Sequence, residues 1–187
     1  TGGVESGGRS DRRRSGRACV RCIYDSTIPG TTFDDDGMCS YCALHDEMDA
    51  QYPTGAEGEV LLQSAVDEMR DAGKGKEFDC VLGVSGGCDS SFLAHELVAR
   101  GLRPLAVHFD NTWDSPSATN NIYTVLDKLE MPLETLVVDN LEYDDIHRSF
   151  IESGVRDLEA PTDIGLMGVL YRVSEKHGIK YIVEGHS

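Results

Sequence analysis

The sequence predicts a doubly wound α/β domain with a mainly parallel sheet, preceded by a small zinc ribbon built on four cysteines. Apolar strand-like runs alternate with amphipathic helical segments over residues 57–187, a rhythm typical of parallel sheets with helices on both faces. The first of those runs leads into a glycine- and serine-rich loop at residues 85–90. Two Cys-x-x-Cys pairs precede the domain at the spacing of a metal site.

Length and composition indicate a globular chain. Its 187 residues suffice for one ordinary domain and a small module, and 40% of them are apolar. No apolar run approaches the length of a membrane span, and the N-terminus lacks the hydrophobic stretch of a signal peptide. We therefore expect a cytoplasmic protein without a membrane span.

Charge is distributed unevenly along the chain. The formal net charge is −16, yet residues 1–17 carry five arginines against two acidic residues and are predicted to form a disordered Arg-rich arm. The remaining 170 residues hold 12 basic and 31 acidic side chains. So acidic a body repels polyanions, which disfavours nucleic acid as a partner.

Four cysteines predict a structural zinc site within residues 18–56, the predicted ribbon and linker. The sixteen residues between the two pairs fall within the interval of four-cysteine zinc sites, and the turn signals between them suggest a short hairpin. A disulfide pair and an iron–sulfur cluster are the alternatives, the first disfavoured in the cytoplasm. The expected ligands are Cys19, Cys22, Cys39 and Cys42.

The nucleotide-binding domain is predicted to occupy residues 57–187 and, because the chain stops on a strand-end loop, to continue beyond Ser187. The domain is expected to begin with a bridging helix over 57–72, and Thr162 or Asp163 is expected to cap its last helix. The predicted strands are 79–84, 104–110, 133–139 and 180–184, and the predicted helices of the sheet domain are 90–100, a segment around 122–129, 141–153 and 163–177.

The loop after the first strand has the features of a phosphate site. Its glycines allow close backbone approach, its serines offer hydroxyl donors, and the following helix start attracts anions. Asp89 is a candidate Mg²⁺ or loop-orienting carboxylate, unless it only complements the helix dipole, and we expect Cys88 to be non-catalytic. The expected nucleotide-binding residues here are Val84, Ser85, Gly86, Gly87, Cys88, Asp89 and Ser90.

Other candidates lie near the ends of later strands and at a helix start. His108, Phe109 and Asp110 end the second strand, and together with the following run Asn111–Trp113 they are expected to face nucleotide or substrate. Asp163 precedes a helix on the same side of the sheet, and Gly185 follows the fourth strand. The competing interpretations are loop ordering for Asp110, helix capping for Asp163 and a simple turn at Gly185.

The loop Ser85-Gly-Gly-x-Asp-Ser resembles the PP-loop of the ATP pyrophosphatases, the Rossmann-like adenine nucleotide alpha hydrolase superfamily. Within that superfamily, the order of motifs resembles the N-acetyl sugar amidotransferases of bacterial surface-polysaccharide (lipopolysaccharide) synthesis. The resemblance extends over nearly all of residues 18–187, and the motifs that carry it are Cys19–Gly30, Phe33–Cys42, Ser85–Ser91, Arg103–Asn111 with Trp113, Asn120–Ile122 and Glu159–Asp163. The chain departs from the family at Cys88, often Lys in relatives, and at Thr112, usually Gly.

The resemblance implies an activity. ATP, with Mg²⁺, would adenylate the N-acetyl group of a nucleotide-linked sugar, and ammonia from a separate glutaminase subunit would displace AMP to leave an acetamidino sugar. Asp89, Asp110 and Asp163 are the candidate catalytic carboxylates. Two alternatives remain: ATP-dependent tRNA thiolation, against which the acidic body argues, and a zinc-ribbon module that binds ATP without turnover.

Overall fold

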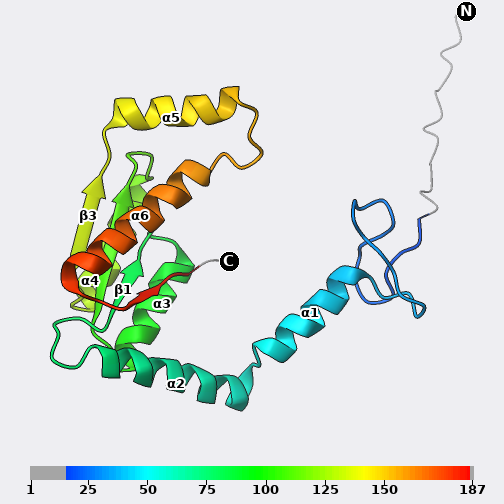
Figure 1. Ribbon diagram of the computed structural model, residues 1–187, viewed down its shortest axis with the longest axis horizontal. Helices are drawn as coiled ribbons and strands as arrows, with labels where there is room; N and C mark the ends of the chain where they lie inside the picture. Colours follow the sequence, from blue (N-terminus) through cyan, green and yellow to red (C-terminus); the bar gives the residue numbers. More distant parts are fainter. Residues whose placement is uncertain (1–15, 186–187) are drawn as a thin grey trace, which may run out of the picture. The chain divides into compact units, whose positions relative to one another are not determined.

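A computed structural model describes residues 16–185, which form two compact units that meet in sequence between Val60 and Leu61 (Figure 1). The N-terminal unit holds the cysteine pairs, and the C-terminal unit holds the sheet. The elements in chain order are α1 (Ser40–Gln51), α2 (Gly55–Ala72), β1 (Cys80–Gly83), α3 (Cys88–Ala99), β2 (Pro104–Asp110), α4 (Pro116–Lys128), β3 (Leu133–Val137), α5 (Asn140–Glu152), α6 (Ala160–His177) and β4 (Tyr181–Val183).

The sheet has four parallel strands in the order β3-β2-β1-β4. The chain first runs outward from β1 through β2 to β3, and then returns to place β4 on the other side of β1. That reversal makes a topological switch point between β1 and β4. The predicted doubly wound, parallel α/β fold is therefore confirmed.

Two apolar clusters cover the two faces of the sheet. On one face α2, α3 and α4 pack on β1 and β2, and on the other face α6 packs on the same strands. Strands β1 and β2 are apolar on both sides because each face is covered by helices. Fully buried residues of the two clusters include Val66, Cys80, Leu82, Ala94 and Ala106 on one face and Val81, Val107 and Leu170 on the other.

The starts of α3 and α6, which border the predicted site, differ from the prediction. α3 begins at Cys88 rather than Ser90, so the second half of the predicted loop is already the first helical turn. α6 begins at Ala160 with Glu159 as its N-cap, so the expected cap at Thr162 or Asp163 is wrong. Pro161 explains the shift, since its missing N–H suits the first turn of a helix.

The N-terminal unit contains a helix that the sequence did not predict. α1 starts at Ser40, directly after Cys39, in a region where the sequence predicted only the ribbon and a linker. The expected hairpin between the cysteine pairs is replaced by two isolated antiparallel bridges, Ala18 with Asp25 and Phe33 with Cys39. The predicted arm lies outside the described residues except for its last two, of which Arg17 donates a hydrogen bond to the Asp34 carbonyl.

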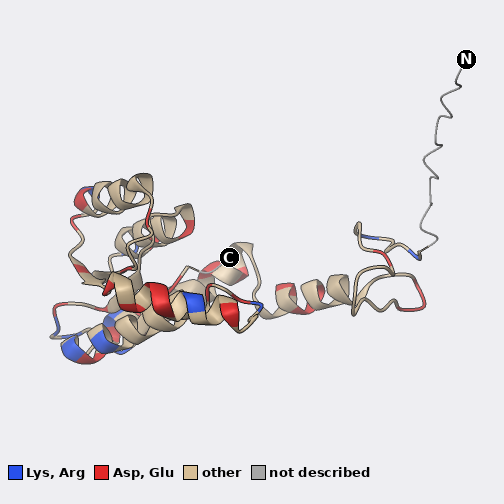
Figure 2. Ribbon diagram, turned by 90° about the horizontal axis from the view of Figure 1, so that it is seen from above, with Lys and Arg blue, Asp and Glu red and all other residues tan. Residues whose placement is uncertain are grey.

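Acidic side chains lie on helices of both units (Figure 2), as the formal net charge of −16 requires. Among the described helices, none combines the length and apolarity needed to cross a membrane.

Candidate nucleotide site and metal centre

The candidate site lies at the carboxyl ends of β1 and β4, the position where open α/β sheets bind ligands. Ser85 follows β1, and Gly185 follows β4. A Cβ built on Gly185 would lie 3.4 Å from the backbone of Asp89 and Ser90, so the β4 end approaches the start of α3 closely. The loop and the last strand therefore form two walls of one site.

Gly86 sets the shape of the loop. Its φ of +75° lies in the left-handed region, and an added Cβ would overlap the carbonyl oxygen of Ala118. Asn121 of α4 donates from Nδ2 to the Gly86 carbonyl at 3.2 Å, and Ser91 donates from Oγ to the Gly87 carbonyl at 2.7 Å. The loop is thus held from α4 and from α3.

The start of α3 is prepared for an anion. Gly87 is the N-cap, and among the described residues no side chain caps this helix, so its first N–H groups are available to a ligand. The Ser85 and Ser90 hydroxyls lie 3.4 Å apart beside these groups. Such an arrangement can hold phosphate oxygens with backbone and hydroxyl donors.

A cavity of about 250 Å³ opens at this point. Seven of the predicted site residues line it: Val84, Ser85, Ser90, His108, Phe109, Asp163 and Gly185. Five others do not: Gly86, Gly87, Cys88, Asp89 and Asp110. The structure therefore brings the loop, the β2 end, the start of α6 and the β4 end together around one space.

The predicted carboxylates occupy different surroundings. Asp163 lines the cavity from the first turn of α6. Asp89 is exposed on the first turn of α3, beside the equally exposed Cys88. Asp110 accepts a hydrogen bond from the Thr112 N–H at 2.8 Å, which fits the loop-ordering interpretation.

His108 ties the loop to the segment after β2. It is 6% exposed, and its Nδ1 donates to the Val84 carbonyl at 3.0 Å. Its Nε2 lies 3.0 Å from Oδ2 of Asp114. His108, Asp110 and Asp114 have ligand atoms within 4.8 Å of one another, but both nitrogens of His108 already face oxygen atoms. A Mg²⁺ ion here would therefore be held through the two carboxylates.

Sequence reasoning missed part of the lining. Asp114, Thr162 and Glu184 contribute polar groups, and Leu166 contributes an apolar one, whereas Asn111, which also lines the cavity, belongs to the run expected to face nucleotide or substrate. Glu184 follows the end of β4, so the strand-end rule used for Gly185 also applies to it. Asp114 and Thr162 depend on how the β2–α4 loop and α6 fold back, for which the sequence carries no local signal.

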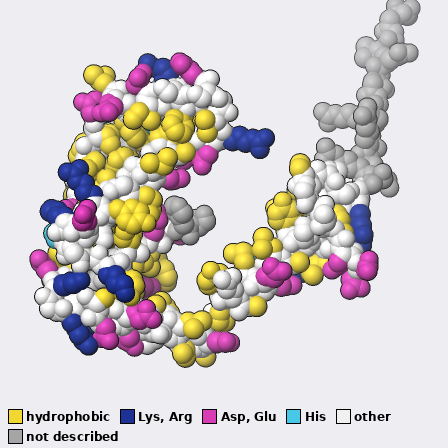
Figure 3. All heavy atoms as spheres, viewed as in Figure 1, with side chains coloured by type: hydrophobic (Ala, Val, Ile, Leu, Met, Phe, Trp, Pro, Cys, Tyr) yellow, Lys and Arg dark blue, Asp and Glu magenta, His cyan; other side chains and the backbone are white. Residues whose placement is uncertain are grey.

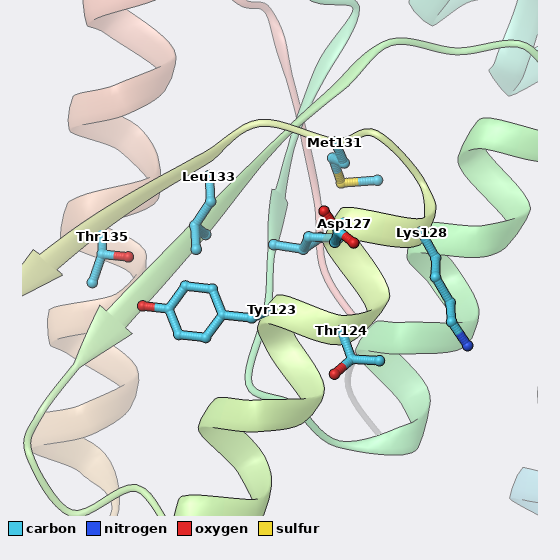
Figure 4. Close-up of a pocket in the computed structure, with 8 residues that line it drawn as sticks. Tyr123, Thr124, Asp127, Lys128, Met131, Leu133 and Thr135 are labelled. Carbon is cyan, nitrogen blue, oxygen red and sulfur yellow. The ribbon is translucent and has the colours of Figure 1, made fainter.

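A larger cavity of about 830 Å³ lies elsewhere, between α4 and the first half of β3. Figure 4 shows Tyr123 and Asp127 of α4 beside Leu133 and Thr135 of β3. This cavity is remote from the carboxyl ends of the strands and contains none of the predicted site residues. Size alone therefore does not identify the site.

The four N-terminal cysteines form a candidate metal centre. Their Sγ atoms all lie within 4.8 Å of one another, with Cys19 and Cys42 3.9 Å apart and Cys22 and Cys39 3.6 Å apart. Tetrahedral coordination by one zinc ion, with Zn–S distances of about 2.3 Å, requires sulfur separations of about 3.8 Å. A four-iron cluster puts each thiolate on a different iron and would spread the sulfurs further. The geometry thus fits a single ion.

Backbone donors prepare these thiols for a metal. Burial acts to raise the pKa of Cys19, but backbone hydrogen bonds from Arg21, Cys22 and Cys39 outweigh it and lower the pKa to about 6. Burial and the neighbouring thiols raise the pKa of Cys42 to about 12. Four thiols packed this closely cannot all ionise without a cation, which a bound metal would supply. All six cysteines, each of them in the described part, are free of disulfides.

Replacing Cys39 with serine is expected to release the metal and unfold the N-terminal unit locally. Cys39 is fully buried among the other thiols, and four-cysteine sites derive their folding free energy from the bound ion. Metal analysis should find about one zinc per chain in the parent protein and none in the variant. Cys88→Ser, at an exposed cysteine outside the cluster, should retain the metal; equal zinc in both variants would refute the assignment.

If the cavity is the ATP site that the sequence predicts, replacing His108 with asparagine should lower ATP-dependent turnover by about 10- to 100-fold, since it removes the hydrogen bond to the Val84 carbonyl and the contact with Asp114 together. Pyrophosphate release should be measured alongside thermal unfolding. His95→Asn, at an exposed histidine of α3, is the matched control and should leave both unchanged. Full turnover by the His108 variant would contradict a positioning role.

Together, the fold and the site define a doubly wound α/β protein with an anion-ready loop at its switch point and a separate four-cysteine centre. No family model and no curated protein matches the chain.

Several solved structures have similar folds. They include NMN synthetase from Francisella tularensis, with 19% identity over 64% of this chain and 50% of that one and a TM-score of 0.46. NH3-dependent NAD synthetase from Campylobacter jejuni has 18% identity over 66% of this chain and 54% of that one, with a TM-score of 0.47. U34-tRNA thiolase from Methanococcus maripaludis has 13% identity over 91% of this chain and 54% of that one, with a TM-score of 0.45. The chain spans about half the length of these structures, and the site is assigned from its own geometry.

Proposed function

We propose that the protein is an ATP-dependent amidotransferase of the PP-loop ATP pyrophosphatase superfamily. Its substrate would be a nucleotide-linked N-acetyl sugar of bacterial surface-polysaccharide (lipopolysaccharide) synthesis, and its products an acetamidino sugar, AMP and pyrophosphate. The observation that carries the proposal is the loop at residues 85–90, which presents hydroxyls and an uncapped helix start beside the cavity at the switch point.

The reaction has two steps that suit this arrangement. The acetamido oxygen attacks the α-phosphorus of ATP and expels pyrophosphate, which the loop would hold with the backbone N–H groups of α3 and the hydroxyls of Ser85 and Ser90. Ammonia then adds to the activated carbon, the C–O bond breaks, and AMP leaves. Adenylation is needed because an amide oxygen is a poor leaving group.

The carboxylates in and near the cavity have different proposed roles. Asp163 faces the cavity from α6 and is placed to orient the incoming ammonia and accept its proton. Asp110 and Asp114 are the carboxylates that would hold Mg²⁺, which neutralises phosphate charge during adenylation. Asp89 is exposed on α3, where it would act on the loop from outside the cavity. A glutaminase subunit would supply the ammonia.

One observation favours a second candidate, ATP-dependent tRNA thiolation. Cys88 is an exposed thiol at the start of α3, next to the predicted phosphates, where a nucleophilic cysteine could act. It has no neighbouring thiol partner in the described residues: Cys80 is buried in β1, where burial raises its pKa to about 12, and the other four cysteines form the metal centre. The amidotransferase is therefore preferred.

Pyrophosphate release from ATP tests the proposal. The protein should release pyrophosphate when given UDP-N-acetylglucosamine or another nucleotide-linked N-acetyl sugar, and ammonium should be required for amidine product. Absence of sugar-dependent release would refute the proposal, whereas tRNA-dependent release abolished by Cys88→Ser would establish thiolation. Tight ATP binding without release under any condition would indicate a binding module.

A further inference from the structure

Four aromatic side chains gather beside the cavity. Phe109 of β2, Trp113 of the β2–α4 loop, and Tyr143 and His147 of α5 form a continuous cluster, here called the aromatic shelf. Ring centroids lie 4.4 Å apart for Trp113 and His147, 4.7 Å for Tyr143 and His147, and 5.6 Å for Trp113 and Tyr143. Figure 3 shows hydrophobic side chains gathered around α5 and α6.

One side of the shelf is buried in the protein, and the other side is exposed to solvent. Tyr143 and His147 are each 5% exposed, whereas Trp113, which packs on both, is 53% exposed. Their rings hold one side of the indole, so much of the remainder faces solvent. A large aromatic side chain held in place and left uncovered is a surface suited to binding another flat ring.

The shelf is continuous with the cavity. Phe109 belongs to the shelf and also lines the cavity. The Tyr143 hydroxyl shares a 2.7 Å hydrogen bond with Oγ1 of Thr162, which lines the cavity next to Asp163. A ligand that enters the cavity can therefore extend onto the shelf without leaving the protein surface.

The surroundings of the shelf favour an uncharged planar ring. Nε2 of His147 is buried and has no hydrogen-bond partner among the described residues, although buried polar atoms are normally paired. The helix α5 that carries His147 holds four acidic residues, Glu142, Asp144, Asp145 and Glu152, against one arginine, Arg148. An acidic helix disfavours phosphate close to it, so the uncharged base of a nucleotide, and not its phosphates, is expected to lie against α5.

We propose that the aromatic shelf binds the nucleobase of the nucleotide-linked acceptor by stacking on Trp113; this inference rests on the proposed function. The cavity of about 250 Å³ is smaller than the about 300–1,000 Å³ usual for small-molecule sites, so two nucleotides cannot both fit inside it. With the ATP phosphates on the loop and the acetamido group near Asp163, the far end of the acceptor reaches the shelf.

Intrinsic fluorescence tests this directly, because Trp113 is the only tryptophan of the chain. Its emission should change saturably when UDP-N-acetylglucosamine, CMP-N-acetylneuraminic acid, or the matching free nucleotide is added. Free N-acetylglucosamine should have no effect. A change with ATP and none with either nucleotide sugar would assign the shelf to the adenine and overturn the inference.

Calorimetric measurement of nucleotide-sugar binding to substituted proteins provides a second test. Trp113→Ala should weaken binding of the active nucleotide sugar by about 5- to 150-fold, the range expected for loss of one base–aromatic stack. Trp113→Phe should restore most of the affinity. Tyr123→Ala is the matched control, because Tyr123 is 60% exposed and lies in the larger, remote cavity. Unchanged affinity in Trp113→Ala would refute stacking.

The two proposals fail in different ways. If nucleotide sugars quench Trp113 fluorescence but no sugar-dependent pyrophosphate is released, base stacking on the shelf is supported and the amidotransferase proposal is refuted. If sugar-dependent pyrophosphate release is normal and Trp113→Ala leaves the KM for the sugar unchanged, only the inference of base stacking on the shelf is refuted. Absence of quenching by both the UDP-linked and the CMP-linked sugar also overturns the inference.

Discussion

Replacing Gly86 with alanine is expected to reduce ATP-dependent pyrophosphate release by about 100-fold or more, since displacing a phosphate-positioning loop by about 1 Å can cost that much. Gly86 has a φ of +75°, and a Cβ there would overlap the Ala118 carbonyl oxygen. The loop can relieve the overlap only by moving away from α4, which also breaks the hydrogen bond from Asn121. Steady-state assays with saturating ATP would measure the loss.

Gly75→Ala separates backbone strain from steric overlap. Gly75 has nearly the same φ, +77°, but a Cβ added there would meet no atom within 4 Å. Its substitution should cost only the left-handed penalty of about 1–2 kcal/mol in unfolding free energy and leave turnover unchanged. Gly86→Ala should cost about 1–3 kcal/mol more, as overpacking does. Equal effects at the two positions would show that the contact with Ala118 carries no weight.

The fold was predictable because its signals are local. Apolar runs between turn residues define the strands, and β2 has the predicted bounds, Pro104–Asp110. Glycines and serines after an apolar run similarly indicate the phosphate loop. The four cysteines needed only their spacing to be assigned to one cluster.

The rest of the site depends on contacts between distant segments. His108 was expected to face nucleotide or substrate, and it does line the cavity, but its contacts with Val84 and Asp114 follow from strand pairing and from the path of the β2–α4 loop. The aromatic shelf joins Trp113 to α5, about thirty residues later in the chain. No periodicity within either segment reveals such a meeting.

Thr112 shows how a sequence departure gains meaning from the backbone. The resemblance places glycine at this position in relatives, and the structure gives Thr112 a φ of +67°. A β-branched residue is strained in that region, whereas glycine is not. Asp110 offsets part of the strain by accepting the Thr112 N–H at Oδ1, so this carboxylate orders the loop although it does not line the cavity.

Replacing Arg103 with methionine is expected to destabilise the C-terminal unit by about 3–5 kcal/mol, the usual cost of leaving a buried charge without its partner. Asp79 is 2% exposed, and Arg103 donates to it from its backbone N–H at 2.8 Å and from its guanidinium at 2.6 and 3.1 Å. The same guanidinium donates to the carbonyls of Gly73 and Lys76, which close the end of α2. Denaturant unfolding at pH 7 would measure the loss.

Replacing the other member of the pair, Asp79, should reduce the unfolding free energy by less. In Asp79→Asn the remaining Arg103 side chain is 50% exposed and can return to water, so a loss of about 1–2 kcal/mol is expected. Arg148→Met is the matched control, because its ion pair with Asp145 is exposed and should contribute less than about 1 kcal/mol. Equal losses for Arg103→Met and Arg148→Met would show that burial of Asp79 does not matter.

The effect of pH gives an independent check. Burial acts to raise the pKa of Asp79, but the hydrogen bonds and charge of Arg103 outweigh burial and leave the pKa below its ordinary value. A carboxyl whose pKa is lowered by folding stabilises the native state above its unfolded pKa of about 3.9 and loses that contribution as the pH falls further. In Arg103→Met the unpaired, buried Asp79 should have a raised pKa and take up a proton as the pH falls. The difference in unfolding free energy between the parent protein and the variant should therefore be largest near pH 7, shrink as the pH falls, and be smallest below about pH 4. A difference that persists undiminished in acid would mean that Arg103 stabilises the unit through the carbonyls of α2 and not through the charge of Asp79.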